Sequence, residues 1–222
     1  MKRIKLFVSV FAALALVGAF ALAAGAETVV LFEDDFDGYL LKDHWVATGA
    51  IEPFNRVEVF DGALEFEGSF GNEGFGVWAK PVFELLDGPI TIEVSVTRNA
   101  SADWQETTIW FIHEWLPNMD PWVNGTFLRV MMLSQGRIVI QREHGRGVGR
   151  ILAEAQGWPP GEREDVQFTI DDENYKVVVN GVTIAEGAHD LPFTTGYLYI
   201  ADWNSLAGDI DYIHHVRVVQ ER

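Results

Sequence analysis

The residues best suited to chemistry in this sequence are tryptophans with polar neighbours. The chain contains eight tryptophans, and half of them surround one predicted strand and the loop that follows it, together with a histidine and an arginine. Sugar rings present C–H faces that stack on indole, while their hydroxyl groups need polar partners at the ring edge. The pattern therefore predicts a carbohydrate site, and packing of the same side chains in a core is the alternative. The candidate ligand residues are Trp104, Trp110, His113, Trp115, Trp122 and Arg129.

The stretch Glu164–Glu186 shows most clearly which elements position these residues. Apolar and polar residues alternate on both sides of a turn at Asp171–Asn174, and period-2 alternation is typical of strands with one buried face. Asn180-Gly181 then separates two such runs, as a type I′ hairpin turn requires. We expect a three-stranded antiparallel meander.

The remaining sequence repeats this pattern with almost no helical periodicity. We expect roughly a dozen strands at a spacing typical of a two-sheet sandwich or a barrel. A glycine-rich loop is expected at 68–76. A second hairpin is expected at 57–66, where Asp61-Gly62 is the two-residue turn between two apolar runs. The other predicted strands lie near 29–37, 77–85, 90–97, 107–113, 127–133, 138–142, 148–155, 197–202 and 210–219.

Residues 1–26 have the composition of a secretory signal peptide. A basic start at Lys2, Arg3 and Lys5 precedes an apolar run over 6–24 and a small-residue site at Ala24-Gly25-Ala26. The run is long enough that an uncleaved membrane anchor is the alternative. We expect cleavage after Ala26, export to the periplasm or the extracellular space, and a single mature domain at 27–222.

The charge and cysteine content exclude several classes of function. Three of the 16 basic residues and none of the 33 acidic ones lie in the first 26 positions, so the mature domain carries a formal charge of about −20. Such a surface repels nucleic acid and anionic lipid, and it disfavours strongly anionic polysaccharides. A salt-rich habitat would also explain the acidity. The absence of cysteine excludes disulfides, zinc–thiolate sites and cysteine nucleophiles.

Five short motifs occur in the order found in one superfamily. They are F-E-D-D-F-D-G at 32–38, Trp45, D-G-A-L at 61–64, Y-K-V-V-V-N-G-V at 175–182 and I-D-Y-I-H-H-V-R-V at 210–218. Together they resemble the concanavalin A-like lectin/glucanase superfamily, and in particular its laminarinase-like family 16 glycoside hydrolases. The resemblance implies an all-β fold, a jelly-roll sandwich of two curved antiparallel sheets.

The resemblance does not extend to the hydrolytic site. Those hydrolases carry E-x-D-x-E on a strand of the concave sheet, where alternation places nucleophile and general acid on one face. The corresponding strand here is 127–133, with Arg129, Met131 and Leu133 at the three positions. The sequence therefore disfavours retaining hydrolysis of that type. The resemblance also implies a structural calcium ion, with Asp35, the Gly62 carbonyl and Asp211 as ligands.

Jelly-roll polysaccharide lyases give a second comparison. They combine Q-I-H on a strand with a tyrosine, and this chain has Phe111-Ile112-His113 with Tyr197 or Tyr199. Arg129 would neutralise the uronate carboxylate.

Three functions therefore stay open. The first is an exported, non-catalytic domain that binds a neutral or weakly charged polysaccharide or oligosaccharide on its concave face. The second is a polysaccharide-active enzyme, a hydrolase or lyase with a non-standard site. The third is a structural or adhesive surface domain. We expect neither nucleic acid nor, after signal cleavage, a membrane as a partner.

Overall fold

The computed structural model describes residues 27–49, 55–68, 74–99, 105–144, 149–203 and 209–222. They form two eight-stranded antiparallel sheets. Sheet A contains β1 (Thr28–Asp34), β3 (Asn55–Phe60), β4 (Ala63–Gly68), β7 (Ile90–Thr97), β12 (Arg163–Ile170), β13 (Asn174–Val179), β14 (Val182–Ala188) and β16 (Ile210–Glu221). Sheet B contains β2 (Trp45–Thr48), β5 (Phe75–Ala79), β6 (Phe83–Glu84), β8 (Glu106–Ile112), β9 (Thr126–Leu133), β10 (Arg137–His144), β11 (Arg150–Gln156) and β15 (Thr195–Trp203).

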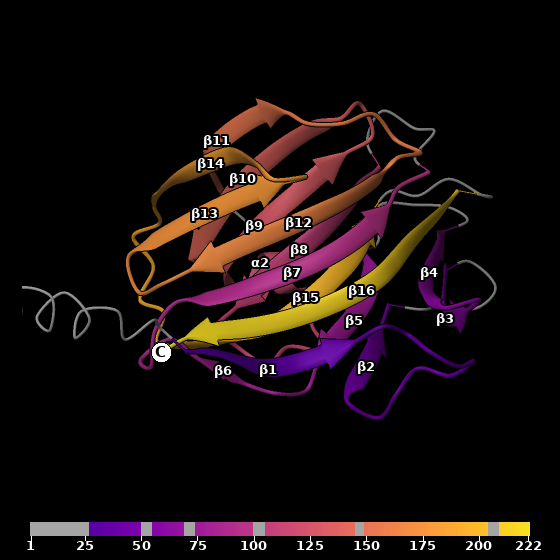
Figure 1. Ribbon diagram of the computed structural model, residues 1–222, viewed down its shortest axis with the longest axis horizontal. Helices are drawn as coiled ribbons and strands as arrows, with labels where there is room; N and C mark the ends of the chain where they lie inside the picture. Colours follow the sequence, from indigo (N-terminus) through magenta and orange to yellow (C-terminus); the bar gives the residue numbers. More distant parts are fainter. Residues whose placement is uncertain (1–26, 50–54, 69–73, 100–104, 145–148, 204–208) are drawn as a thin grey trace, which may run out of the picture.

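The two sheets lie face to face as a sandwich (Figure 1). Strands far apart in the sequence pair at the centre of each sheet. In sheet A, β7 lies between β12 and β16, and in sheet B, β8 lies between β9 and β15. This non-local pairing is the arrangement of a jelly roll and confirms the predicted all-β sandwich.

The predicted meander is present as β12, β13 and β14. Asn180 and Gly181 have φ values of 49° and 78°, and Asp61 and Gly62 have 50° and 77°. Positive φ at both central residues is the condition for a type I′ turn, so both dipeptides form the tight hairpins that their sequences predict.

The core lies between the sheets and is aliphatic and aromatic. On each strand the residues that face the partner sheet alternate with residues that face away. Val166, Phe168 and Ile170 of β12 are buried, and they pack with Leu128, Val130 and other inward-facing side chains of sheet B. At one edge β11 and β14 approach each other, and Leu152 and Ile184 extend the core between them.

Some elements differ from the sequence prediction. The described part of the chain contains sixteen strands, because the segment 77–85 divides into β5 and β6 and because Trp45–Thr48 is a strand too short for periodicity to reveal. A short helix, α2 (Pro121–Asn124), lies in the tryptophan- and proline-rich loop. Asp120 caps it, since its carboxylate accepts a hydrogen bond from the Trp122 backbone N–H.

Neither α2 nor any other described helix is long and apolar enough to cross a bilayer. The apolar run at 6–24, the predicted signal peptide and its cleavage site lie outside the described residues.

Candidate functional site

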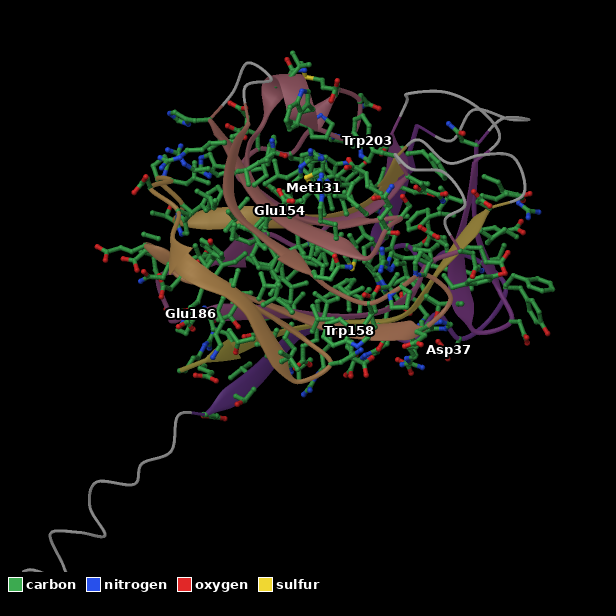
Figure 2. The ribbon with its side chains drawn as sticks, turned by 90° about the horizontal axis from the view of Figure 1, so that it is seen from above. Asp37, Met131, Glu154, Trp158, Glu186 and Trp203 are labelled. Carbon is green, nitrogen blue, oxygen red and sulfur yellow. The ribbon has the colours of Figure 1, made fainter. Side chains whose placement is uncertain are left out.

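The candidate site lies on the outer face of sheet B, the face turned away from sheet A. Alternation on β9 sends Leu128, Val130 and Met132 into the core, so Arg129, Met131 and Leu133 project outward. Figure 2 shows Met131 on this side of the molecule, together with Trp203 of β15. The three positions that match the hydrolase carboxylates therefore do face the predicted binding surface, but they carry no acid.

Arg129 is the centre of a buried polar contact on this face. Its guanidinium carbon lies 4.4 Å from the Trp110 ring centroid and 4.7 Å from that of Trp122. Its Nε donates to Gln141 at 2.9 Å, and an Nη atom lies 3.3 Å from a Glu106 carboxylate oxygen. Burial lowers the pKa of Arg129 to about 10, although Glu106 opposes this change. Even so, the guanidinium stays charged at neutral pH.

Trp110 and Arg129 support the surface and do not form it. Trp110 is fully buried and donates a hydrogen bond to Thr108, and Arg129 is only 6% exposed. Trp122 is half-buried over the guanidinium, and Gly149 makes room for its ring, because a Cβ at Gly149 would lie 2.8 Å from it. A ligand can therefore contact Trp122, whereas the buried Trp110 and Arg129 only hold Trp122 in position.

Trp115 is the most exposed of the described candidates. It is 36% exposed, and its ring packs against Trp78 at 5.4 Å and Tyr197 at 5.1 Å. Trp78 in turn stacks on Tyr199 at 4.6 Å. The indole of Trp115 is thus held in place by other aromatic rings while one side faces solvent. Trp104 lies outside the described residues.

Trp203 lies on the same face, although it was not among the candidate ligand residues selected from the sequence. It stands directly opposite Glu106 in the β15–β8 pairing and packs on Trp110 at 6.4 Å between ring centroids. A Cβ at Gly74 would fall inside its ring. The glycine at this position indicates that a large side chain packs against the backbone. Only the pairing of β5 with β15 identifies that side chain as Trp203.

His113 does not meet a tyrosine in the manner of the lyases. It follows β8 on the side opposite to Ile112, and its ring nitrogen bonds the Thr195 carbonyl at 3.2 Å. Tyr197 is paired with Ile112 and faces outward. Tyr199 also faces outward, but it is buried and burial raises the pKa of its hydroxyl, which opposes a role as a base.

The two buried carboxylates of this face lie too far apart to act together as a glycosidase pair. Glu106 and Glu143 are its buried acids, and β9 separates the strands that carry them. Glu106 is level with Leu133 on β9 and Glu143 with Phe127, six residues further along. At ~3.3 Å per residue and ~4.8 Å per strand, the two lie on the order of 20 Å apart. Hydrolases need roughly 5–10 Å.

The three predicted calcium ligands do not converge. Asp35 is exposed, and Gly62 lies in the exposed β3–β4 turn. Asp211 is fully buried between the sheets, where its carboxylate accepts hydrogen bonds from the Asn99 backbone N–H at 2.8 Å and from the Thr107 hydroxyl. Burial raises the pKa of Asp211 to about 6. The predicted set therefore fits calcium poorly, and calcium binding itself stays a prediction.

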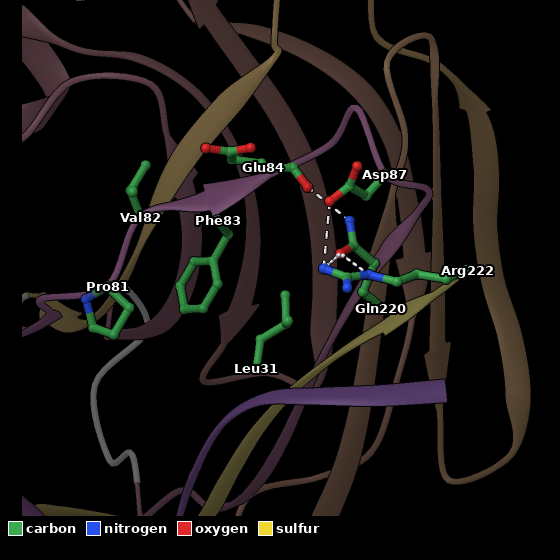
Figure 3. A pocket seen from close by; sticks show the side chains of 8 residues that line it. All are labelled: Leu31, Pro81, Val82, Phe83, Glu84, Asp87, Gln220 and Arg222. Carbon is green, nitrogen blue, oxygen red and sulfur yellow. Dashed lines mark hydrogen bonds and ion pairs between the residues drawn. The ribbon is translucent and has the colours of Figure 1, made fainter. Parts of the chain in front are cut away.

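A depression at the edge of the sandwich is a weaker candidate (Figure 3). Its volume is about 220 Å³, and Leu31, Phe83 and the β16 terminus line it. Its polar groups bond one another: Gln220 donates to the Glu84 carbonyl at 2.7 Å, and Arg222 lies 3.3 Å from Asp87. These contacts leave few polar groups directed at a ligand.

Solved structures resemble this chain over most of its length. A structure reported for endo-acting O-glycanases of the human gut microbiota has a TM-score of 0.68, with 15% identity over 87% of this chain and 100% of that one. An endo-β-1,3-glucanase from Pyrococcus furiosus has a TM-score of 0.66, with 14% identity over 90% and 97%. The Emp47p carbohydrate recognition domain has a TM-score of 0.64, with 14% identity over 85% and 94%.

The chain has the concanavalin A-like jelly-roll fold. This confirms the fold that the five sequence motifs imply. No family model and no curated protein matches the chain. At such low identity the resemblance establishes the fold alone, and the function must be inferred from the site.

Proposed function

We propose that the mature domain is exported and binds a neutral or weakly charged polysaccharide on the outer face of sheet B without cleaving it. The observation that carries the proposal is the presence of Trp115, Trp122 and Trp203 on one face, each at least partly exposed and held by neighbouring rings. Rigid indoles lose little conformational freedom when a sugar stacks on them.

The fold supports the same function. The similar structures include both glucanases and a carbohydrate recognition domain. The placement of the two buried acids supports a non-catalytic role, because Glu106 is paired with Arg129 and lies far from Glu143. A neutral ligand follows from the acidic surface, which repels polyanions.

Calorimetric titration with soluble β-1,3-glucan, alongside a glycan array, tests the proposal. Each sugar–indole contact is worth roughly 1 kcal/mol, by analogy with aromatic pairs, so we expect dissociation constants on the order of micromolar to millimolar. Trp115→Ala and Trp203→Ala should each weaken binding about fivefold. Tyr39→Ala is the control, because Tyr39 is 81% exposed and lies in the β1–β2 loop, outside the strands of sheet B.

A reducing-end assay on the same glycans decides between binding and catalysis. One observation favours a catalytic alternative: burial raises the pKa of Glu106, which a general acid requires. Release of oligosaccharides by the wild type, and its loss in Glu106→Gln, would establish that alternative. Binding without release would support the non-catalytic function, and unaltered binding by both tryptophan variants would contradict the proposed site.

A further inference from the structure

The core of the sandwich ends in a layer of buried polar side chains. The inward-facing positions along β7, β8, β12, β15 and β16 are mostly apolar and become polar at the same end of the sandwich. We call this set the polar layer. It consists of Arg98, Gln105, Thr107, Glu164, Asp202 and Asp211, none of them more than 1% exposed.

One half of the polar layer is neutral. Arg98 Nε lies 2.6 Å from a Glu164 carboxylate oxygen, and both side chains are almost completely buried. The two Nη atoms of Arg98 donate to the carbonyls of Leu133 at 2.6 Å and Trp158 at 3.0 Å. The described hydrogen bonds of the Arg98 guanidinium therefore go to Glu164 and to two backbone carbonyls, and none goes to Asp202 or Asp211.

The other half of the polar layer contains two carboxylates. Thr107 stands opposite Asp202 in the β8–β15 pairing, and such residues have Cβ atoms about 5 Å apart. The Thr107 hydroxyl also bonds Asp211, which reaches it from sheet A. Asp211 from sheet A and Asp202 from sheet B are therefore both neighbours of Thr107. The layer has three acids and one arginine, which gives a formal charge of −2 at neutral pH.

Gln105 adds a buried amide directed into the same region. Its backbone carbonyl accepts a hydrogen bond from Ser134 N–H at 3.0 Å, so the β8–β9 pairing continues to this residue. Its side chain consequently points to the same side as Thr107, two residues later. Neither its amide oxygen nor its amide nitrogen has a hydrogen-bond partner, and the residue is 0% exposed. A buried amide without partners indicates a missing ligand or water.

We propose that the polar layer binds a calcium ion between Asp202 and Asp211, with the Gln105 amide oxygen as a further ligand. The donors are all oxygen atoms, which suit calcium and not zinc. A divalent ion would also balance the formal charge of the layer. No three His, Cys, Asp or Glu side chains among the described residues converge as a metal site, so the site depends on the amide oxygen and on water to complete its coordination.

Metal analysis of the refolded protein tests the proposal. Wild-type protein is unfolded in guanidinium chloride with chelator and refolded in chelator-free buffer with or without calcium chloride. We expect one tightly held calcium per chain by mass spectrometry of the metal. We also expect a melting temperature about 5–10 °C higher with calcium, as saturation at roughly a hundred times the dissociation constant gives for a domain of this size.

Four variants locate the ion. Asp202→Asn and Gln105→Leu keep the side-chain volume and should abolish both the bound metal and the thermal shift. Asp35→Asn should retain both, which separates this site from the one that the superfamily resemblance implies. Asp172→Asn is the control for a lost surface charge, because Asp172 is exposed.

Metal-free wild-type protein with no thermal shift would overturn the proposal, and so would loss of calcium in Asp35→Asn alone. If Asp202→Asn does not fold, the wild-type metal content and Gln105→Leu still decide the question.

Discussion

At the residue scale, the carboxylate of Asp34 holds the first two strands of the domain together. Its buried carboxylate accepts hydrogen bonds from the Phe36 backbone N–H at 2.9 Å, Lys42 at 2.7 Å and the Trp45 indole at 2.8 Å. His44 lies 2.7 Å from it. Burial by itself would raise the pKa of Asp34, but the hydrogen bonds, that of Lys42 foremost, outweigh it and lower the pKa. One acid thus ties β1 to β2 across a ten-residue loop.

We predict that Asp34→Asn lowers the free energy of unfolding at pH 7 by about 2–4 kcal/mol, because an amide cannot accept from so many donors and leaves some of them unpaired. A lowered pKa contributes stability above the unfolded-state pKa, and that contribution is lost as the pH falls through the folded-state pKa. The difference between wild type and variant in urea unfolding should therefore be constant above about pH 5 and narrow towards pH 3.

Asp37→Asn is the matched control. Asp37 also pairs with Lys42, at 2.6 Å, but its side chain is 79% exposed. We expect little change in its urea midpoint, since solvent screens exposed ion pairs. An Asp34→Asn difference that stayed the same at every pH would contradict the assigned role of the charge.

At the element scale, the sequence predicted the strands whose two faces differ. The meander β12–β14 and the two type I′ hairpins follow from alternation and from Asn-Gly and Asp-Gly, which are local signals. Alternation also placed Arg129 and Met131 correctly on the outer face of β9. The burial of Trp110 could not be predicted in this way. It depends on which strands pair with β8, for example on Tyr199 lying opposite Trp110, and no local sequence pattern contains this information.

The packing of β5 against β15 illustrates the same limit and leads to a prediction. Gly74 precedes β5, and the indole of Trp203 occupies the space that a Cβ would need. Gly74→Ala should displace Trp203, lower the free energy of unfolding by about 1–3 kcal/mol, and weaken glucan binding as Trp203→Ala does. Urea unfolding and calorimetric titration measure the two effects.

Gly187→Ala provides the comparison for this substitution. Gly187 lies on the edge strand β14, where the nearest atom to a new Cβ would be 3.5 Å away, an ordinary contact. Its stability and binding should match those of the wild type. Equal behaviour of the two alanine variants would show that Trp203 is not held against Gly74.

At the scale of the whole molecule, one open edge of the sandwich carries acids. Glu154 on β11 and Glu186 on β14, the last strands of their sheets, lie along this edge (Figure 2). Charged residues on edge strands oppose pairing with another chain. The described ion pairs compensate only part of the charge, because residues 27–222 include about twenty more acidic than basic residues.

This excess predicts how stability depends on salt. Like charges on a compact surface repel one another more strongly than in the expanded, unfolded chain, and salt screens exposed charges beyond about 10 Å at 0.1 M ionic strength. We expect potassium chloride to raise the melting temperature by a few degrees between ~0.02 and ~0.5 M. The measurement is made with chelator present, so that calcium cannot contribute.

The same titration in sucrose, which adds no charge, distinguishes screening from a general solute effect, because only screening should saturate as the Debye length falls below the spacing of the charges. A melting temperature that decreased with potassium chloride would mean that attractive ion pairs, such as Arg217 with Glu93, outweigh the net repulsion.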